Sequence, residues 1–129
     1  MKIYTFGYGG KSLKALAERV RELNAIVLDV RFSPRSYVPQ WRAQTLCREL
    51  EGFYAHVQEW GNAHYQLPEL GIKIVDWDAG LAQLHIVEDS GLYDAAVLMC
   101  GCTEYRRCHR RGLADALTLL GYEVEELAL

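Results

Sequence analysis

Residues 95–112 read AAVLMCGCTEYRRCHRRG, and they decide how we interpret the fold. The first six residues are an uninterrupted apolar run, which is typical of a strand buried on both faces of a parallel sheet. A loop rich in cysteine and arginine follows. Apolar residues at helical spacing then predict a helix over residues 109–120. The stretch therefore predicts a strand, a loop and a helix in succession.

The rest of the chain repeats this alternation. The run AIVLDV at residues 25–30 predicts a second buried strand. We expect further strands over residues 2–8, 53–57 and 122–127, helices over residues 13–23, 40–50 and 79–88, and irregular structure from 60 to 71. Alternating strands and helices pair in parallel and place helices on both faces of the sheet. We predict an α/β fold: a single three-layer domain over residues 1–129, with a mainly parallel sheet and helices on both faces.

Composition excludes several classes of protein. A chain of 129 residues has the usual size of one domain, and its net charge of −3 argues against a sequence-independent nucleic-acid binder. No apolar run is long enough for a signal peptide or a membrane span. Of four cysteines, three are crowded between positions 100 and 108, unlike a secreted disulfide framework. We expect a cytoplasmic protein with reduced thiols and no membrane partner.

The arginines are concentrated in two short stretches. Both begin in loops that follow predicted strands, where sheets of this kind bind their ligands. Several of them crowd the start of the helix at 109, although a helix N-terminus is already partly positive. A bound phosphate, sulfate or carboxylate would relieve this repulsion. The alternative is that these arginines are solvated or pair with Glu104. The eight are Arg31, Arg35, Arg42, Arg48, Arg106, Arg107, Arg110 and Arg111, of ten in the chain.

The cysteines leave three interpretations open. Cys100 ends its strand beside helix N–H groups and arginines, which lower a thiol pKa and suit a nucleophile. Cys100, Cys102, Cys108 and His109 are also possible zinc ligands, but their spacing matches no common zinc module and the arginines repel a cation. Cys100 and Cys108 are otherwise small buried hydrophobes or a redox pair. We predict neither a metal nor a cofactor.

A second loop, from Asp29 to Trp41, offers further ligand-binding groups. Asp29 and Arg31 lie two residues apart on one face of a strand, so they either orient each other towards a ligand or form a structural salt bridge. Arg35 and Ser36 add donors, and Trp41 either stacks on a ring or covers the core. His56 and Asn62 follow another strand and are candidates for the same rim.

The proton carriers complete the candidate site. His109 at the helix start is a general base or a helix cap, and Glu104 is a second proton carrier. We expect Arg110 to bind the anion and to be replaceable with little loss of stability. The predicted catalytic residues are Cys100, His109 and Glu104; the predicted ligand-binding residues are Tyr8, Asp29, Arg31, Arg35, Ser36, Arg106, Cys108 and Arg110.

Five motifs in order carry a resemblance over nearly the whole chain. They are TFGYGG at 5–10, LDVR at 28–31, PRSYVPQW at 34–41, YAHVQEWGN at 54–62, and VLMC followed by CHR between 97 and 110. The chain resembles the domain-of-unknown-function 488 family, which implies a compact α/β fold with these motifs around one pocket and supplies no reaction. The family usually has His and Ser where Tyr8 and Gly9 stand, and Glu where Cys102 stands. A looser similarity, in LDVR and the cysteine loop, is to rhodanese-like domains.

Our leading hypothesis is an enzyme or ligand sensor for a phosphate-bearing small molecule or nucleotide, with hydrolase or transferase chemistry at Cys100. One alternative is a non-enzymatic module that binds a nucleic-acid end or a phosphorylated partner, and nucleic acid is not favoured. Another is sulfur transfer in the rhodanese manner. We make no prediction of the oligomeric state.

Overall fold

A five-stranded parallel sheet forms the centre of the molecule. The computed structural model describes residues 1–102 and 107–129. The strands lie in the order β3-β2-β4-β1-β5, and every neighbouring pair is parallel. Their bounds are β1 Lys2–Gly7, β2 Ala25–Asp29, β3 Tyr54–His56, β4 Ala95–Cys100 and β5 Glu123–Glu126. The parallel sheet predicted from alternating strands and helices is confirmed.

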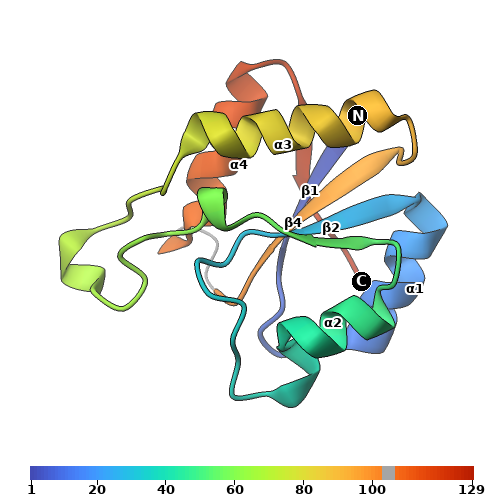
Figure 1. The fold of residues 1–129 in the computed structure, drawn as a ribbon, viewed down its shortest axis with the longest axis horizontal. Coiled ribbons are helices and arrows are strands. Elements are labelled where there is room, and N and C mark those ends of the chain that lie inside the picture. Colours follow the sequence, from blue (N-terminus) through green and yellow to red (C-terminus); the bar gives the residue numbers. More distant parts are fainter. Residues whose placement is uncertain (103–106) are drawn as a thin grey trace.

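Helices cover both faces of this sheet, as Figure 1 shows. Helices α1 (Leu13–Leu23) and α2 (Ala43–Glu49) pack on one face, and α3 (Trp77–Ser90) and α4 (His109–Leu119) pack on the other. Successive strand residues alternate between the two layers. Val97 therefore joins the core under α1 and α2, whereas Leu98 joins the core under α3 and α4. The predicted three-layer α/β architecture is confirmed.

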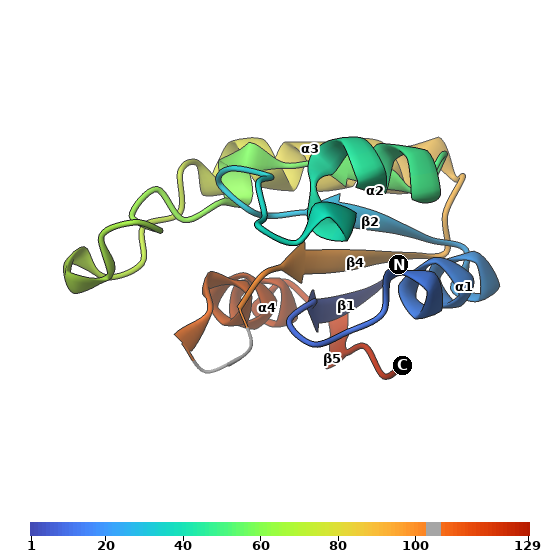
Figure 2. The ribbon, with the colours of Figure 1, turned by 90° about the horizontal axis from the view of Figure 1, so that it is seen from below.

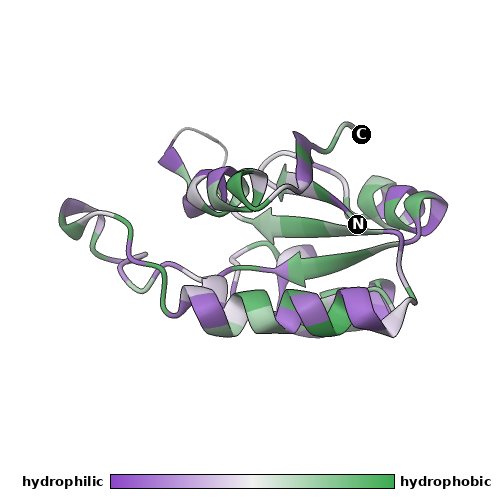
Figure 3. Cartoon of the chain, turned by 90° about the horizontal axis from the view of Figure 1, so that it is seen from above, coloured by the Kyte–Doolittle hydropathy of each residue, from purple (hydrophilic) through white to green (hydrophobic). Residues whose placement is uncertain are grey.

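Burial follows the pattern that the apolar runs predict. All six residues of β4 and all five of β2 are buried, and both strands are apolar in Figure 3 except where β2 ends at Asp29. The edge strand β5 is largely exposed and reads EVEE, charges that discourage pairing with another chain. None of the helices in the described part of the chain is long and apolar enough to cross a membrane.

Two helices begin elsewhere than the periodicity predicts. The helix expected from residue 40 is a short 3-10 turn, η1 (Pro39–Trp41), followed by α2 from Ala43, because Arg42 between them is extended. Helix α3 begins at Trp77, two residues before the predicted start, because the Asp76 side chain accepts a hydrogen bond from Ala79 N and caps it.

The topology opens a crevice at the carboxyl ends of the central strands. Neighbouring strands β1 and β4 lead to helices on opposite faces, α1 and α4, so the loops that leave them diverge. Ligand sites of parallel sheets form at such points. The segment 61–76, which contains the 3-10 turn η3 (Pro68–Leu70), projects from the same end of the molecule (Figure 2).

Candidate functional site

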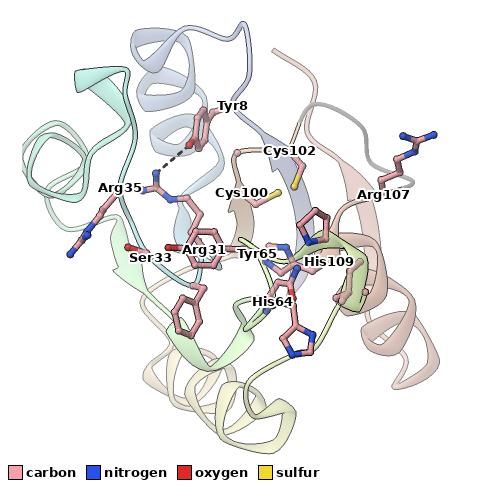
Figure 4. A pocket seen from close by; sticks show the side chains of 16 residues that line it. Tyr8, Arg31, Ser33, Arg35, His64, Tyr65, Cys100, Cys102, Arg107 and His109 are labelled. Atoms are coloured by element: carbon pink, nitrogen blue, oxygen red, sulfur yellow. Dashed lines mark hydrogen bonds between the residues drawn. The ribbon is translucent and has the colours of Figure 1, made fainter.

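A cavity of about 580 Å³ lies at this end of the sheet. The loops that follow β1, β2 and β4 form its floor and one wall, and the projecting segment forms the other. Figure 4 shows these side chains surrounding the cavity. The lining residues are Tyr8, Arg31, Phe32, Ser33, Arg35, Asn62, His64, Tyr65, Pro68, Gly71, Ile72, Cys100, Gly101, Cys102, Arg107 and His109.

Cys100 is a buried thiol in this cavity, at the end of β4. Its Sγ lies 2.8 Å from Cys108 Sγ and 3.1 Å from Arg110 Nη1. Hydrogen bonding to Cys102 and then to Cys108, with the positive charge of Arg110, lowers the Cys100 pKa well below its ordinary value, against the effect of burial. The same hydrogen bonds raise the pKa of Cys102 and Cys108. Of the three cysteines, Cys100 is therefore the one whose pKa its surroundings lower.

Arg110 donates a hydrogen bond to this sulfur but is not among the residues that line the cavity. Nη1 donates to Cys100 Sγ and, at 2.9 Å, to the Cys102 carbonyl oxygen, while Nη2 donates to Glu126 at 3.2 Å. The approach requires glycine at position 7, since a Cβ there would lie 2.2 Å from the Cys102 oxygen and 2.8 Å from Arg110 Nη1. Arg110 is only 2% exposed, and this burial argues against the prediction that it is replaceable with little loss of stability.

His109 turns one ring nitrogen towards the thiols. Its Nε2 lies 2.6 Å from the Val30 carbonyl oxygen, which can only accept, so Nε2 carries the hydrogen. In the neutral ring Nδ1 is then free of hydrogen, and it lies 3.8 Å from Cys108 Sγ. The helix-cap alternative fails for His109, because Cys108 caps α4 by accepting from Arg110 N at 3.5 Å.

Asp29 and Arg31 form a buried salt bridge. Arg31 Nε and Nη2 donate to the two carboxylate oxygens of Asp29 at 2.8 and 2.6 Å, and Nη1 donates to the Trp41 carbonyl oxygen at 2.7 Å. Tyr54 Oη donates to the same carboxylate at 2.5 Å. Arg31 also reaches Tyr8 Oη at 3.4 Å, the dashed contact of Figure 4. The pair that strand spacing predicts forms here, and it holds Arg31 in the cavity wall.

The other predicted residues of the second loop divide between the cavity and its surroundings. Arg35 is exposed and lines the rim, whereas Ser36 lies outside the lining and its Oγ accepts from Val38 N. The Trp41 indole is buried and stacks on Tyr8, with ring centroids 4.6 Å apart, so it belongs to the core. His56 also lies outside the lining, and its Nε2 contacts the Arg31 carbonyl oxygen at 2.7 Å.

The arginines do not converge on one point. Arg111 points along α4 to Asp115 at 3.8 Å, and Arg48 pairs with Glu49. Arg35 and Arg107 lie on opposite sides of the cavity, with their guanidinium groups directed away from its centre (Figure 4). Glu104 and Arg106 lie outside the described residues, so their predicted roles stay predictions.

The projecting segment supplies a wall that sequence reasoning missed, apart from Asn62. Asn62 Oδ1 accepts from His64 N and Lys73 N, both at 3.0 Å, which closes the segment on itself. Tyr65 packs against Phe32 across the cavity wall, with ring centroids 5.5 Å apart. No periodicity marks this stretch, and its chain of turns offered no sequence signal for a wall.

The cysteine loop also gathers four potential metal ligands. One donor atom each of Cys100, Cys102, Cys108 and His109 lies within 4.8 Å of all the others. The sequence offered these four residues as possible zinc ligands although their spacing matches no common zinc module, and their proximity depends on how β4 and the start of α4 approach each other.

Comparison with known proteins yields one family. A family model described as a domain of unknown function, DUF488, matches residues 12–117. Comparisons with curated proteins and with solved structures gave no significant match. The family description assigns no activity, and the family predicted from the five motifs is confirmed. The chain belongs to the DUF488 family.

Proposed function

We propose that the protein is a cysteine-dependent hydrolase or transferase acting on a phosphate-bearing small molecule, with a nucleotide as the favoured class. The observation that carries this proposal is the position of Cys100: the residue lines the cavity, and its Sγ accepts a hydrogen bond from Arg110 at 3.1 Å. A thiolate stabilised by a guanidinium is the reactive form of cysteine.

The charge of the cavity supports an anionic substrate. Among the described lining residues there are three arginines and no carboxylate. Asp29 pairs with Arg31 outside the cavity lining, and Arg35 and Arg107 place two further guanidinium groups among the lining residues. Positive charges around the mouth of a cleft attract an anion towards it over a distance, without pointing into it. Phosphate esters satisfy this requirement.

The shape of the cavity favours a substrate with a planar ring. A volume of about 580 Å³ is in the usual range for small-molecule sites, roughly 300–1,000 Å³. Phe32, Tyr65 and Ile72 supply an aromatic and apolar wall beside the charged rim. A nucleotide has both a ring for this wall and a phosphate for the arginines.

The chemistry proceeds in two steps. In the first, the Cys100 thiolate forms a bond to the electrophilic centre, and the leaving group departs with the electrons of the broken bond and takes a proton from solvent. In the second, water or an acceptor alcohol displaces the sulfur, and His109 Nδ1 receives the proton that this nucleophile loses. Hydrolase and transferase differ only in that second nucleophile. Glu104 remains a predicted proton carrier.

Thermal unfolding against a panel of anions tests the binding. The panel contains phosphate, sulfate, nucleotides, sugar phosphates and short oligonucleotides, with EDTA present throughout. A ligand at a hundredfold its Kd adds about 2.7 kcal/mol, a shift of several degrees for a chain of this size. The absence of a shift with every anion would refute the proposal.

Turnover of the binding class tests the chemistry. Cys100→Ser should abolish turnover and leave binding intact, while Cys47→Ser, which changes an exposed thiol, should leave both unchanged. Binding of oligonucleotides with steep salt dependence and no turnover would instead identify a non-enzymatic module. A persulfide on Cys100, seen by mass spectrometry, would identify sulfur transfer.

A further inference from the structure

We propose that Cys100, Cys102, Cys108 and His109 bind one Zn²⁺ ion. Three thiols and an imidazole are a donor set that zinc prefers in proteins. One donor atom from each of the four residues lies within 4.8 Å of the others, and three of the four residues are buried. The site would join the end of β4 to the start of α4.

The geometry of the donors is close to what tetrahedral zinc needs. Zn–S bonds of about 2.3 Å place two sulfurs about 3.8 Å apart. The distance from His109 Nδ1 to Cys108 Sγ is already 3.8 Å. Cys100 and Cys108, with sulfurs 2.8 Å apart, need to separate by about 1 Å when the metal binds.

The surroundings of the donors match those of metal ligands. Histidine ligands nearly always donate their second ring N–H to a carboxylate or a backbone carbonyl, which fixes the nitrogen that faces the metal. His109 Nε2 donates to the Val30 carbonyl oxygen at 2.6 Å, so Nδ1 faces the thiols. Backbone Arg110 N donates to Cys108 Sγ at 3.5 Å, and such hydrogen bonds stabilise a bound thiolate.

The neighbouring arginines do not prevent the binding of a cation. Three thiolates and Zn²⁺ carry a net charge of −1, which the guanidinium of Arg110 at Cys100 Sγ balances. Arg111 pairs with Asp115 along the helix, and the guanidinium of Arg107 points away from the sulfurs (Figure 4). The repulsion that four arginines imply in the sequence therefore reduces, among the described residues, to one favourable contact.

Zinc binding goes beyond the proposed enzyme function and excludes it in the loaded protein. Each thiol that binds as a thiolate releases its proton to solvent, and the metal then occupies the sulfur lone pair with which Cys100 would attack a substrate. The metal-bound and reactive forms therefore exclude each other, and Zn²⁺ inhibits any turnover that depends on Cys100.

Metal titration of the reduced, EDTA-treated full-length protein tests the site. Zn²⁺ is titrated in competition with a chromophoric chelator, and Co²⁺ serves as a spectroscopic probe of the ligands. We expect one equivalent per chain, and for Co²⁺ a thiolate charge-transfer band with the intense visible bands of tetrahedral coordination. Less than about a tenth of an equivalent, in protein that is folded by circular dichroism, would overturn the proposal.

Single substitutions identify the ligands. Cys102→Ser changes a half-buried side chain, so the fold should survive, and it should weaken Zn²⁺ affinity at least about 100-fold, since outer-shell partners alone are worth about 10- to 100-fold. Cys47→Ser is the matched control and should bind as the wild type does. Unchanged affinity in Cys102→Ser would overturn the site. The anion panel is run in EDTA, so a failure of zinc binding leaves the proposed enzyme function standing, and the converse also holds.

Discussion

Two buried arginines lie near the carboxyl ends of the neighbouring strands β2 and β4 and differ in the group that each one contacts. Arg31 follows β2 and is paired with the fully buried Asp29 carboxylate, which also accepts from Tyr54. Arg110, at the start of α4, is paired with the Cys100 sulfur that ends β4. Both guanidinium groups are almost wholly removed from water, so both need a negative partner.

This difference indicates that the Arg31 pair stabilises the structure, whereas the Arg110 pair controls the reactivity of a cysteine. The carboxylate beside Arg31 is held by both guanidinium nitrogens that face it, so this pair fixes the cavity wall. A cysteine beside Arg110 can lose its proton, and the resulting thiolate can take the proton back, bind a metal or attack an electrophile. The two pairs are therefore expected to respond differently to substitution, in stability for the first and in reactivity for the second.

The largest effect on stability is expected from Asp29→Ala. Removing one partner of a buried salt bridge leaves Arg31 uncompensated, and the free energy of unfolding should fall by about 3–5 kcal/mol, measured by urea denaturation. The control is Asp115→Ala, whose pair with Arg111 is exposed and should contribute less than about 1 kcal/mol. Equal losses in the two variants would show that burial does not distinguish these pairs.

A smaller loss is expected from Arg110→Met, about 2–3 kcal/mol, because Cys100 can take up a proton when its cation is removed. The same variant should slow alkylation of Cys100 at neutral pH, since the thiolate loses its guanidinium. Arg111→Met, one position along the helix, is the control and should change neither quantity. If Arg110→Met and wild type alkylate equally fast, Arg110 does not stabilise the thiolate.

Tyr54→Phe tests whether the Asp29–Arg31 pair affects the pair of Arg110 and Cys100. It removes the hydrogen bond to Asp29 and leaves the ring in place, so the free energy of unfolding should fall by about 1–2 kcal/mol. Peptide mass spectrometry should find alkylation of Cys100 unchanged. A change in that rate would mean that the two arginine pairs are coupled.

The smallest effect is expected from Glu126→Gln. Its carboxylate is half exposed and contacts Arg110 and Thr5. Glutamine keeps an oxygen that can accept from Arg110, and solvent screens the half-exposed Glu126 charge, so urea denaturation should find a loss below about 1 kcal/mol. A loss as large as that of Arg110→Met would assign the stability of Arg110 to Glu126 and not to Cys100.

Much of the fold and part of the site followed from the sequence. The apolar runs at 25–30 and 95–100 predicted two buried parallel strands, and the strand-to-loop rule placed Cys100 and Arg31 at one edge. The spacing of Asp29 and Arg31 predicted their pair, since residues two apart share a face of a strand. Local patterns of this kind are visible in one stretch of sequence.

The remainder depends on contacts between distant stretches. The Arg110 guanidinium fits beside Gly7 of β1 because glycine has no Cβ there. The periodicity of the sequence does not predict this contact between α4 and β1. The wall formed by Tyr65 comes from a chain of turns held by Asn62. The thiols lie close to His109 because the carboxyl end of β4 and the start of α4 lie side by side. Sequence spacing alone does not define any of these distances.

The most direct test of a reactive thiolate in an anion-binding cavity compares two alkylating reagents on one molecule. Iodoacetate is negatively charged and iodoacetamide is neutral, and peptide mass spectrometry gives the rate of each at Cys100 and at the exposed Cys47 in the presence of EDTA. Because accessibility cancels in the ratio of the two rates, the ratio reports the preference for an anion. We predict a higher iodoacetate-to-iodoacetamide ratio at Cys100 than at Cys47, decreasing at high salt. An equal ratio at both cysteines, or an unreactive Cys100, would contradict the account.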